Sequence, residues 1–202
     1  LPGAHLKVTD ADGNVVDEWT STEESHVIKE LVVGNEYTMT ETKPADGYVT
    51  ASDIRFRLDK KVSDEGEVTT EVFVMDENGN YVNSNNNKVV MYDDTTKVEF
   101  SKTDITGEKE VPGCELEVTD KETGKVMVRW TSTKHKHVVE GKYVVGKTYV
   151  MTEKRPADGF VTADSVEFTI ADTGKVQGVS MKDDTTKIEF SKIASDTKKM
   201  LP

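Results

Sequence analysis

The chain has 202 residues, with 38 Asp+Glu against 26 Lys+Arg and a formal net charge of −12 at pH 7. The hydrophobic content of 35% is low for a helical enzyme. Together with 32% charged residues, it suits one or two small β-sandwiches whose strands have one solvent-exposed face. The acidic balance argues against a nucleic-acid partner. No apolar run reaches the roughly 18 residues of a membrane span, and neither a signal segment nor a sorting tail is present, so we interpret the sequence as a mature piece or an excised fragment.

The charge is unevenly distributed along the chain. Residues 1–95 hold 8 basic and 20 acidic residues, so they carry the whole imbalance. The segment 187–202 has four lysines against Glu189 and Asp196. An acidic first half and a basic tail would attract each other at low salt, although an acidic surface that only maintains solubility explains the first half equally well.

Short alternating segments predict β-strands with one buried face along most of the chain. In chain order they are HLKVTD (5–10), HVIKELVV (26–33), YTMTE (37–41), ELEVTD (115–120), KYVVGKTYVMTE (142–153) and SVEFTIAD (165–172). Turn signals such as DADGN (10–14) and KETGK (121–125) separate them, and no segment has the pattern of an amphipathic helix. This spacing predicts antiparallel two-sheet sandwiches of about a hundred residues each.

The chain carries one cassette twice, out of register. KVEFSKTD (97–104) returns as KIEFSKIA (187–194), so the strand that opens the second repeat also follows it, and the first repeat has no such opening strand. We therefore predict three parts: a sandwich at 1–95 that lacks its first strand, a complete sandwich at 96–186, and a spare first strand at 187–202. About twenty extra residues between Arg57 and Val89 are expected to form an extended hairpin with a polar tip.

Three ionisable residues continue apolar strand faces in the second repeat. Lys102 follows the buried face of VEFSK, Glu153 that of TYVMTE, and Asp183 that of VSMKDD. The first repeat has Glu41 and Asp93 at the equivalent positions but no matching lysine. Buried charges need partners, so the recurrence indicates a buried cluster, although each residue alone could be a strand-end charge in solvent.

These motifs resemble the collagen-adhesin B-type repeats, also called SpaA or pilin-type prealbumin-like domains, of Gram-positive surface proteins. The matching pieces are FSKTD, ETKPADGY and EKRPADGF, and the closing VMYDD and SMKDD, and they extend over essentially the whole chain twice. The resemblance implies an all-β fold of two tandem immunoglobulin-like or prealbumin-like sandwiches in a structural stalk, secreted and anchored to the cell wall as part of a longer protein.

In that family a lysine and a closing-strand Asn or Asp join in a spontaneous isopeptide bond assisted by a glutamate. Carried onto this sequence, Lys102 is the nucleophile, Asp183 the acceptor and Glu153 the proton shuttle, with Asp184 as a rival acceptor on the opposite face. Burial favours a neutral amine and a protonated acid, so folding itself would create the reactive forms without a cofactor. One turnover follows, which is self-modification and not enzymatic catalysis. An unreacted, hydrogen-bonded ion pair is the alternative.

The missing lysine of the first repeat suggests a partner. Lys192 on the spare strand could complete the cluster of Glu41 and Asp93 in another copy, which would link molecules head to tail through a Lys192–Asp93 bond. The same misregister would arise if these residues were cut from a longer tandem array, and the sequence does not separate the two explanations. A module that binds a host protein or glycan through the first repeat is the alternative function.

The remaining chemistry-bearing residues suggest little. Cys114 is the single cysteine, so no internal disulfide can form, and it is expected to be a small buried residue because Ala4 is its counterpart. His135 and His137 lack a third ligand for zinc, so we expect no metal. No Ser/His/Asp arrangement, phosphate loop or dinucleotide fingerprint indicates an enzyme.

Overall fold

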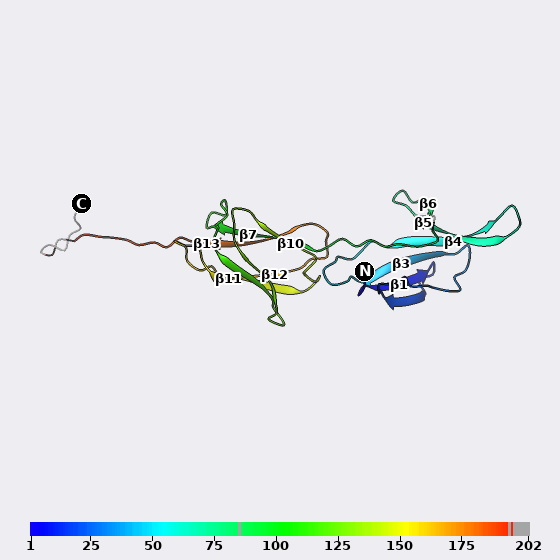
Figure 1. Ribbon diagram of the computed structural model, residues 1–202, viewed down its shortest axis with the longest axis horizontal. Coiled ribbons are helices and arrows are strands. Elements are labelled where there is room, and N and C mark those ends of the chain that lie inside the picture. Colours follow the sequence, from blue (N-terminus) through cyan, green and yellow to red (C-terminus); the bar gives the residue numbers. More distant parts are fainter. Residues whose placement is uncertain (85, 194, 196–202) are drawn as a thin grey trace. The chain divides into compact units, whose positions relative to one another are not determined.

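A computed structural model describes residues 1–84, 86–193 and 195 (Figure 1). The chain divides into two compact units. The first unit comprises Leu1–Val98 with Val138–Lys147 and Thr169–Gln177, and the second comprises Glu99–His137, Thr148–Phe168 and the residues from Gly178 onward. The described residues contain strands and turns and no helix, as the alternating pattern predicts, so they offer no apolar helix that could cross a membrane.

The first six strands form one antiparallel sheet in the order β2-β1-β3-β4-β5-β6. Their bounds are β1 His5–Asp10, β2 Val15–Thr20, β3 Glu36–Lys43, β4 Ile54–Val62, β5 Val68–Met75 and β6 Tyr81–Asn83. Apolar side chains of one face form the core of the first unit, namely Leu6, Val8, Tyr37, Met39 and Phe56. Strands β4 to β6 contain the insertion, which forms two successive hairpins, β4–β5 and β5–β6, where the sequence predicted one extended hairpin.

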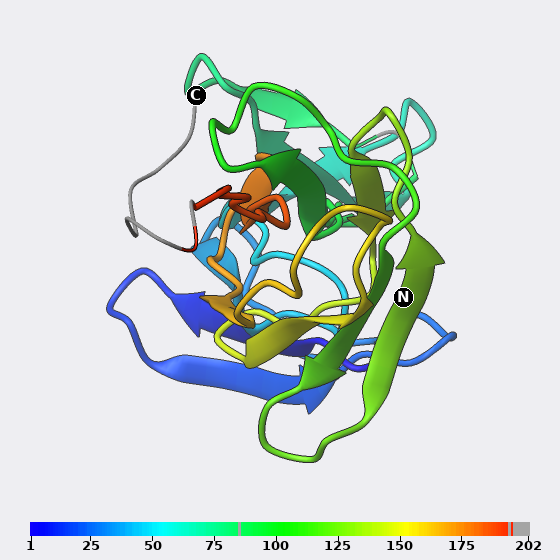
Figure 2. The same ribbon diagram turned by 90° about the vertical axis from the view of Figure 1, so that its left-hand side faces the viewer.

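The other strands form two sheets. The four-stranded sheet has the order β12-β11-β8-β9 and the three-stranded sheet has the order β10-β7-β13. Their bounds are β7 Lys97–Asp104, β8 Glu115–Asp120, β9 Val126–Thr131, β10 His137–Glu140, β11 Thr148–Arg155, β12 Val166–Thr169 and β13 Gln177–Asp183. Figure 2 shows the β8–β9 hairpin in green at the front.

The two repeats have the same register where their sequences align. Leu6 pairs with Trp19 on one side and Glu41 on the other. In the second repeat Leu116 pairs with Trp130 and Glu153 in the same way. The equivalent glutamates therefore occupy the same place on the same strand of each repeat.

Two predicted strand segments are wrong. The first is the start of 142–153, because residues 142–147 form no strand and β11 begins at Thr148. Residues 26–33 form no strand, although their counterpart β10 does, and residues 87–93, the counterpart of β13, form none either. In the second repeat β7 lies between β10 and β13 and hydrogen-bonds to both. Among the described residues the first repeat has no counterpart of β7, so these two segments have no ladder to join. Hydrophobic alternation alone therefore does not make a strand, because a strand also needs a neighbour to pair with.

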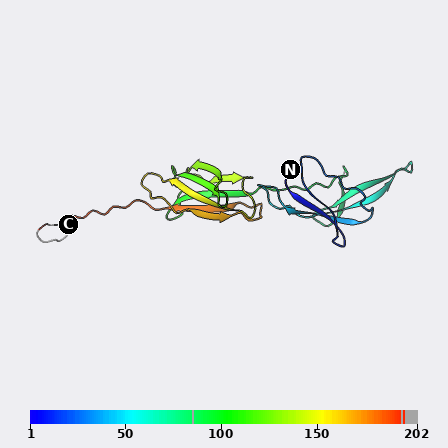
Figure 3. The same ribbon diagram turned by 90° about the horizontal axis from the view of Figure 1, so that it is seen from below.

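The repeated strand sequence has two different environments. In β7, Val98 and Phe100 are 0% and 2% exposed, whereas Ile188 and Phe190, their counterparts, are 77% and 87% exposed. Residues 186–192 belong to no strand, and Figures 1 and 3 show this segment extending away from the strands of the second unit.

Candidate functional site

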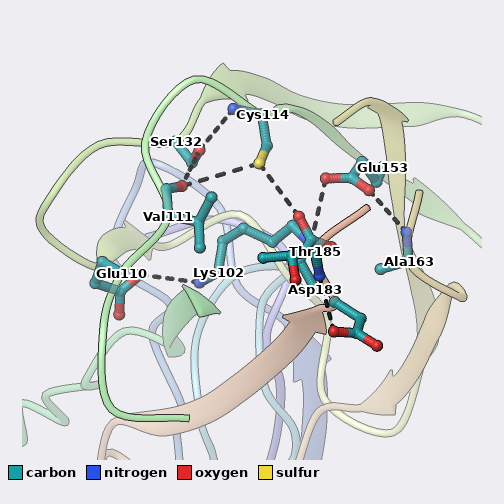
Figure 4. Close-up of polar contacts among 10 residues, drawn as sticks. Lys102, Glu110, Val111, Cys114, Ser132, Glu153, Ala163, Asp183 and Thr185 are labelled. Atoms are coloured by element: carbon teal, nitrogen blue, oxygen red, sulfur yellow. Dashed lines mark hydrogen bonds and ion pairs between the residues drawn. The ribbon is translucent and has the colours of Figure 1, made fainter. Parts of the chain in front are cut away.

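Three elements bring Lys102, Glu153 and Asp183 together inside the second unit (Figure 4). Lys102 comes from β7 and Asp183 from the neighbouring β13, while Glu153 comes from β11 of the four-stranded sheet. Their exposures are 2%, 4% and 1%. Each strand alternates between its two faces, and each of these residues falls on the buried face, so the strand period places all three in the core.

The lysine amine contacts both carboxyl groups. Lys102 Nζ lies against Asp183 Oδ1 and is 3.2 Å from Glu153 Oε1. The other oxygen of Glu153 accepts a hydrogen bond from the backbone N–H of Ala163 at 2.8 Å, which orients the carboxyl group. Glu153 Oε1 is buried and faces the Lys102 amine. It is therefore available to exchange a proton with the amine.

Burial dominates the electrostatics of the acceptor. Desolvation raises the pKa of Asp183 above its ordinary value, and the negative charge of Glu153 raises it further, while the contact with Lys102 opposes both effects. A protonated, uncharged carboxyl is the form that an amine can attack to lose water. Burial therefore shifts Asp183 toward its protonated form, which is the direction that the predicted reaction requires.

Asp184, the rival acceptor, lies elsewhere. Its carboxylate contacts Lys187 Nζ at 2.7 Å, and this hydrogen bond lowers its pKa. It is not among the buried residues. The geometry therefore favours Asp183.

Cys114 also reaches the site, which the sequence did not indicate. Its Sγ lies 3.6 Å from Asp183 Oδ2 and its side chain is fully buried. Sequence reasoning recognised a small buried residue there, but the pattern held no signal that it would face the acceptor, because Cys114 precedes β8 and joins none of the periodic strands.

Metal ligation fits this cluster poorly. Ligand atoms of Cys114, Glu153 and Asp183 lie within 4.8 Å of one another. The Lys102 amine, however, contacts both carboxyl groups and so takes the place beside them that a metal ion would need. The imidazole of His137 stacks on the indole of Trp130, with ring centroids 4.7 Å apart. This is a packing contact between two aromatic rings.

The first unit holds the equivalent carboxyl groups, and no described residue of it is a counterpart of Lys102. Glu41 Oε2 accepts a hydrogen bond from the backbone N–H of Ala51 at 2.7 Å, as Glu153 does from Ala163. Glu41 Oε1 is buried and has no hydrogen-bond partner among the described residues. Burial raises the pKa of Glu41, and the charge of Asp93 raises it further; burial also raises the pKa of Asp93.

Both carboxyl groups line an open groove in the first unit. The groove has a volume of about 840 Å³ and lies over the apolar face of the six-stranded sheet. Its lining includes Leu6, Val8, Trp19, Met39 and Phe56 as well as Glu41 and Asp93. In the second repeat the equivalent face is covered by β7.

Comparisons with known proteins agree with the fold. The SpaA prealbumin-like fold domain family matches residues 1–72 and 96–185. No curated protein matches the sequence.

Several solved structures align with most of this chain at low sequence identity. The shaft pilin SpaA of Lactobacillus rhamnosus GG is 14% identical, with 94% of this chain and 90% of that chain covered and a TM-score of 0.39. The C-terminal fragment of the pilus adhesin SpaC from the same organism is 12% identical, with coverages of 93% and 90% and a TM-score of 0.43. The Bacillus anthracis TIE protein is 18% identical with a TM-score of 0.45, and the 92% of this chain that aligns spans 31% of that protein.

Proposed function

Because the chain belongs to the SpaA prealbumin-like fold domain family, we propose that it supplies structural repeat domains to the stalk of an extracellular surface protein of the pilus or adhesin type. We further propose that an amide bond between Lys102 and Asp183 hardens the second unit. The observation that carries this proposal is the buried contact of the lysine amine with the acceptor carboxyl, beside a glutamate.

The reaction is a condensation within one chain. The neutral amine of Lys102 attacks Cγ of Asp183, Glu153 relays protons through Oε1, and one water leaves. Fixed strands hold the reacting groups together, and such proximity is worth on the order of 7–11 kcal/mol in well-aligned intramolecular reactions. The product would join β7 to β13 covalently, so tension between these strands would be carried by the amide bond as well as by hydrogen bonds. A single turnover makes this a structural protein and not an enzyme.

Intact mass of the denatured chain tests the bond. Wild type is expected to weigh one water less than its sequence, and Lys102→Ala and Glu153→Ala are expected to have the unmodified mass. A wild-type mass equal to that of the sequence would refute the bond and leave an unreacted ion pair. Tandem mass spectrometry of a digest would assign the link to Lys102 and Asp183, and a link to Asp184 would refute the proposed acceptor.

A second proposal concerns contact between copies. The groove of the first unit has a largely apolar lining that includes the carboxyl groups of Glu41 and Asp93. The exposed segment 187–193 repeats the strand that fills the equivalent place in the second repeat. We propose that this segment of one copy pairs over the groove of another, with Ile188 and Phe190 facing the apolar lining and Lys192 facing Asp93. The acidic charge of residues 1–95 favours the approach of a basic segment.

Denaturing gels separate the covalent from the non-covalent part of this assembly. Concentrated wild type is expected to form a ladder, Lys192→Ala to associate in native solution without a ladder, and Phe190→Asp to stay monomeric in both. A wild type that is monomeric in both measurements would rule out the assembly.

Ligand binding is the alternative function. The aromatic residue at the insertion, Tyr81, is half-buried, and the guanidinium of Arg57 lies 4.4 Å from its ring centroid. Because this ring packs against a side chain of its own sheet, it gives the ligand-binding alternative no support.

A further inference from the structure

We propose that Cys114 is a catalytic residue of the second unit, whose S–H group donates a hydrogen bond to Asp183 Oδ2 and stabilises the charge that develops on that oxygen when Lys102 attacks. This inference rests on the proposed Lys102–Asp183 bond. It adds a donor to a reaction that otherwise has a nucleophile, an acceptor and a proton relay. Figure 4 shows the thiol and the lysine amine at the same carboxyl group.

The backbone around Cys114 aims the thiol at the acceptor. Its N–H donates to Ser132 Oγ at 2.8 Å, and that hydroxyl donates to the carbonyl oxygen of Val111 at 2.6 Å. Sγ then lies 3.6 Å from Asp183 Oδ2 and 3.9 Å from the Val111 oxygen. The Val111 oxygen already receives the Ser132 hydroxyl, so Asp183 Oδ2 is the nearer and less occupied acceptor for the single thiol proton.

The thiol acts as a donor and not as a nucleophile. Burial raises the pKa of Cys114 to about 11, so its proton is retained at neutral pH. Only a thiolate is a good nucleophile, whereas a thiol is a weak hydrogen-bond donor. A donor that is already in place costs no reorganisation when charge appears on its acceptor.

The two oxygens of Asp183 contact different groups and have different roles in the reaction. Oδ1 contacts Lys102 Nζ, and Nζ is 3.2 Å from Glu153 Oε1. When Nζ bonds to Cγ, the carbonyl electron pair moves onto Oδ2, beside the thiol. Asp183 reacts as the neutral acid with its proton on Oδ1. Glu153 takes a proton from the amine and passes one to Oδ1, which then carries two protons and leaves as water while the Cγ–Oδ1 bond breaks. Oδ2 remains as the amide oxygen, so one amide forms, one water is lost and the thiol is unchanged.

The first unit shows that the local fold does not need a thiol. Ala4 takes the position of Cys114, and its N–H donates to Ser21 Oγ at 2.9 Å, as Cys114 does to Ser132. Ala4 is also buried, at 4% exposure. The same backbone arrangement therefore forms around a methyl group, in the unit that has two carboxyl groups and no lysine, so Cys114→Ala is expected to fold.

The rate of water loss tests the role of the thiol. Cys114→Ala and Cys114→Ser, each with Lys192→Ala to prevent bonds between copies, are made beside a Lys192→Ala reference in cell-free translation that is stopped at a set time. Intact mass under denaturing conditions then follows the unreacted fraction. We expect bond formation about tenfold slower in Cys114→Ala, less than the 10²–10³ of a full oxyanion donor because a thiol donates weakly. Cys114→Ser is expected to recover part of the rate through its hydroxyl.

The outcomes separate the role of Cys114 from the Lys102–Asp183 bond itself. Equal rates in all three proteins would overturn the role of Cys114 while leaving the bond intact. Equal slowing in Cys114→Ala and Cys114→Ser would assign the loss to packing and would also overturn it. A reference protein that never loses water would refute the underlying bond, and with it this inference. Equal melting temperatures of the fully reacted proteins would support a role in the reaction itself.

Discussion

Replacing Glu153 by glutamine should remove the covalent link while preserving the fold of the second unit. The amide oxygen of glutamine can still accept the hydrogen bond from Ala163, which Glu153 accepts at 2.8 Å, but it cannot relay protons. Lys102 and Asp183 then remain an unreacted buried pair. The difference in stability between wild type and variant is therefore expected to reflect the cross-link.

Its magnitude follows from the sequence separation of the joined residues. Lys102 and Asp183 are 81 residues apart. Closing a loop of this length removes chain entropy from the unfolded state worth about 4.5 kcal/mol. For a domain of this size, each kcal/mol shifts the melting temperature by roughly 4–8 °C, so Glu153→Gln should melt about 20–35 °C below wild type.

Tryptophan fluorescence can follow each unit separately. The chain has two tryptophans, Trp19 in the first unit and Trp130 in the second, where its ring centroid is 5.2 Å from that of Phe100. A Trp19→Phe background leaves Trp130 to report the melting of the second unit. Intact mass of the same samples establishes whether each variant carries the bond.

Glu41→Gln is the matched control for this prediction. It makes the same substitution at the equivalent position, next to the equivalent hydrogen bond from Ala51, in a unit that has no lysine partner. It should leave the mass of the monomeric chain and the melting of the second unit unchanged. The comparison requires a wild type that carries the bond and a Glu153→Gln variant that lacks it. If this variant melts within a few degrees of wild type, the cross-link does not stabilise the second unit as expected.

Three further predictions concern single side chains. Burial raises the pKa of Glu41, so the contribution of this group to stability should be full below the ordinary glutamate pKa of about 4.3. The first unit should lose this contribution as pH rises through the higher pKa of the folded state. Urea titrations should therefore show a weaker pH dependence in Glu41→Gln. Phe100→Ala should lower the unfolding free energy of the second unit by about 3–5 kcal/mol in chemical denaturation. Phe190→Ala, at the exposed repeat of the same position, should lower that of the isolated chain by almost nothing. Equal losses of stability would contradict the difference in burial. Burial lowers the pKa of His137, so its imidazole should favour folding above the ordinary histidine pKa of about 6.5 and reduce stability as pH falls below it; a titration that His137→Phe leaves unchanged would exclude this contribution.

Local sequence determined most of the strands and the inward direction of the key side chains. The period of two placed Lys102, Glu153 and Asp183 on buried faces, because neighbouring residues of a strand point to opposite sides of the sheet. The alignment of the two cassettes also paired Glu41 with Glu153, and both glutamates have the same strand register and the same backbone hydrogen bond. These features follow from residue spacing, which the sequence gives directly, and from the fixed alternation of side chains along a strand.

Only the tertiary structure decided which segments found partners. Residues 26–33 have the alternation of a strand and form none, because strand formation also requires a neighbour with free backbone groups. The contact of Cys114 with Asp183 depends on a hydrogen-bonded connection before β8, where no periodicity applies. A strand's pattern states which face is apolar, but the partner that covers this face is set by packing between residues far apart in the chain.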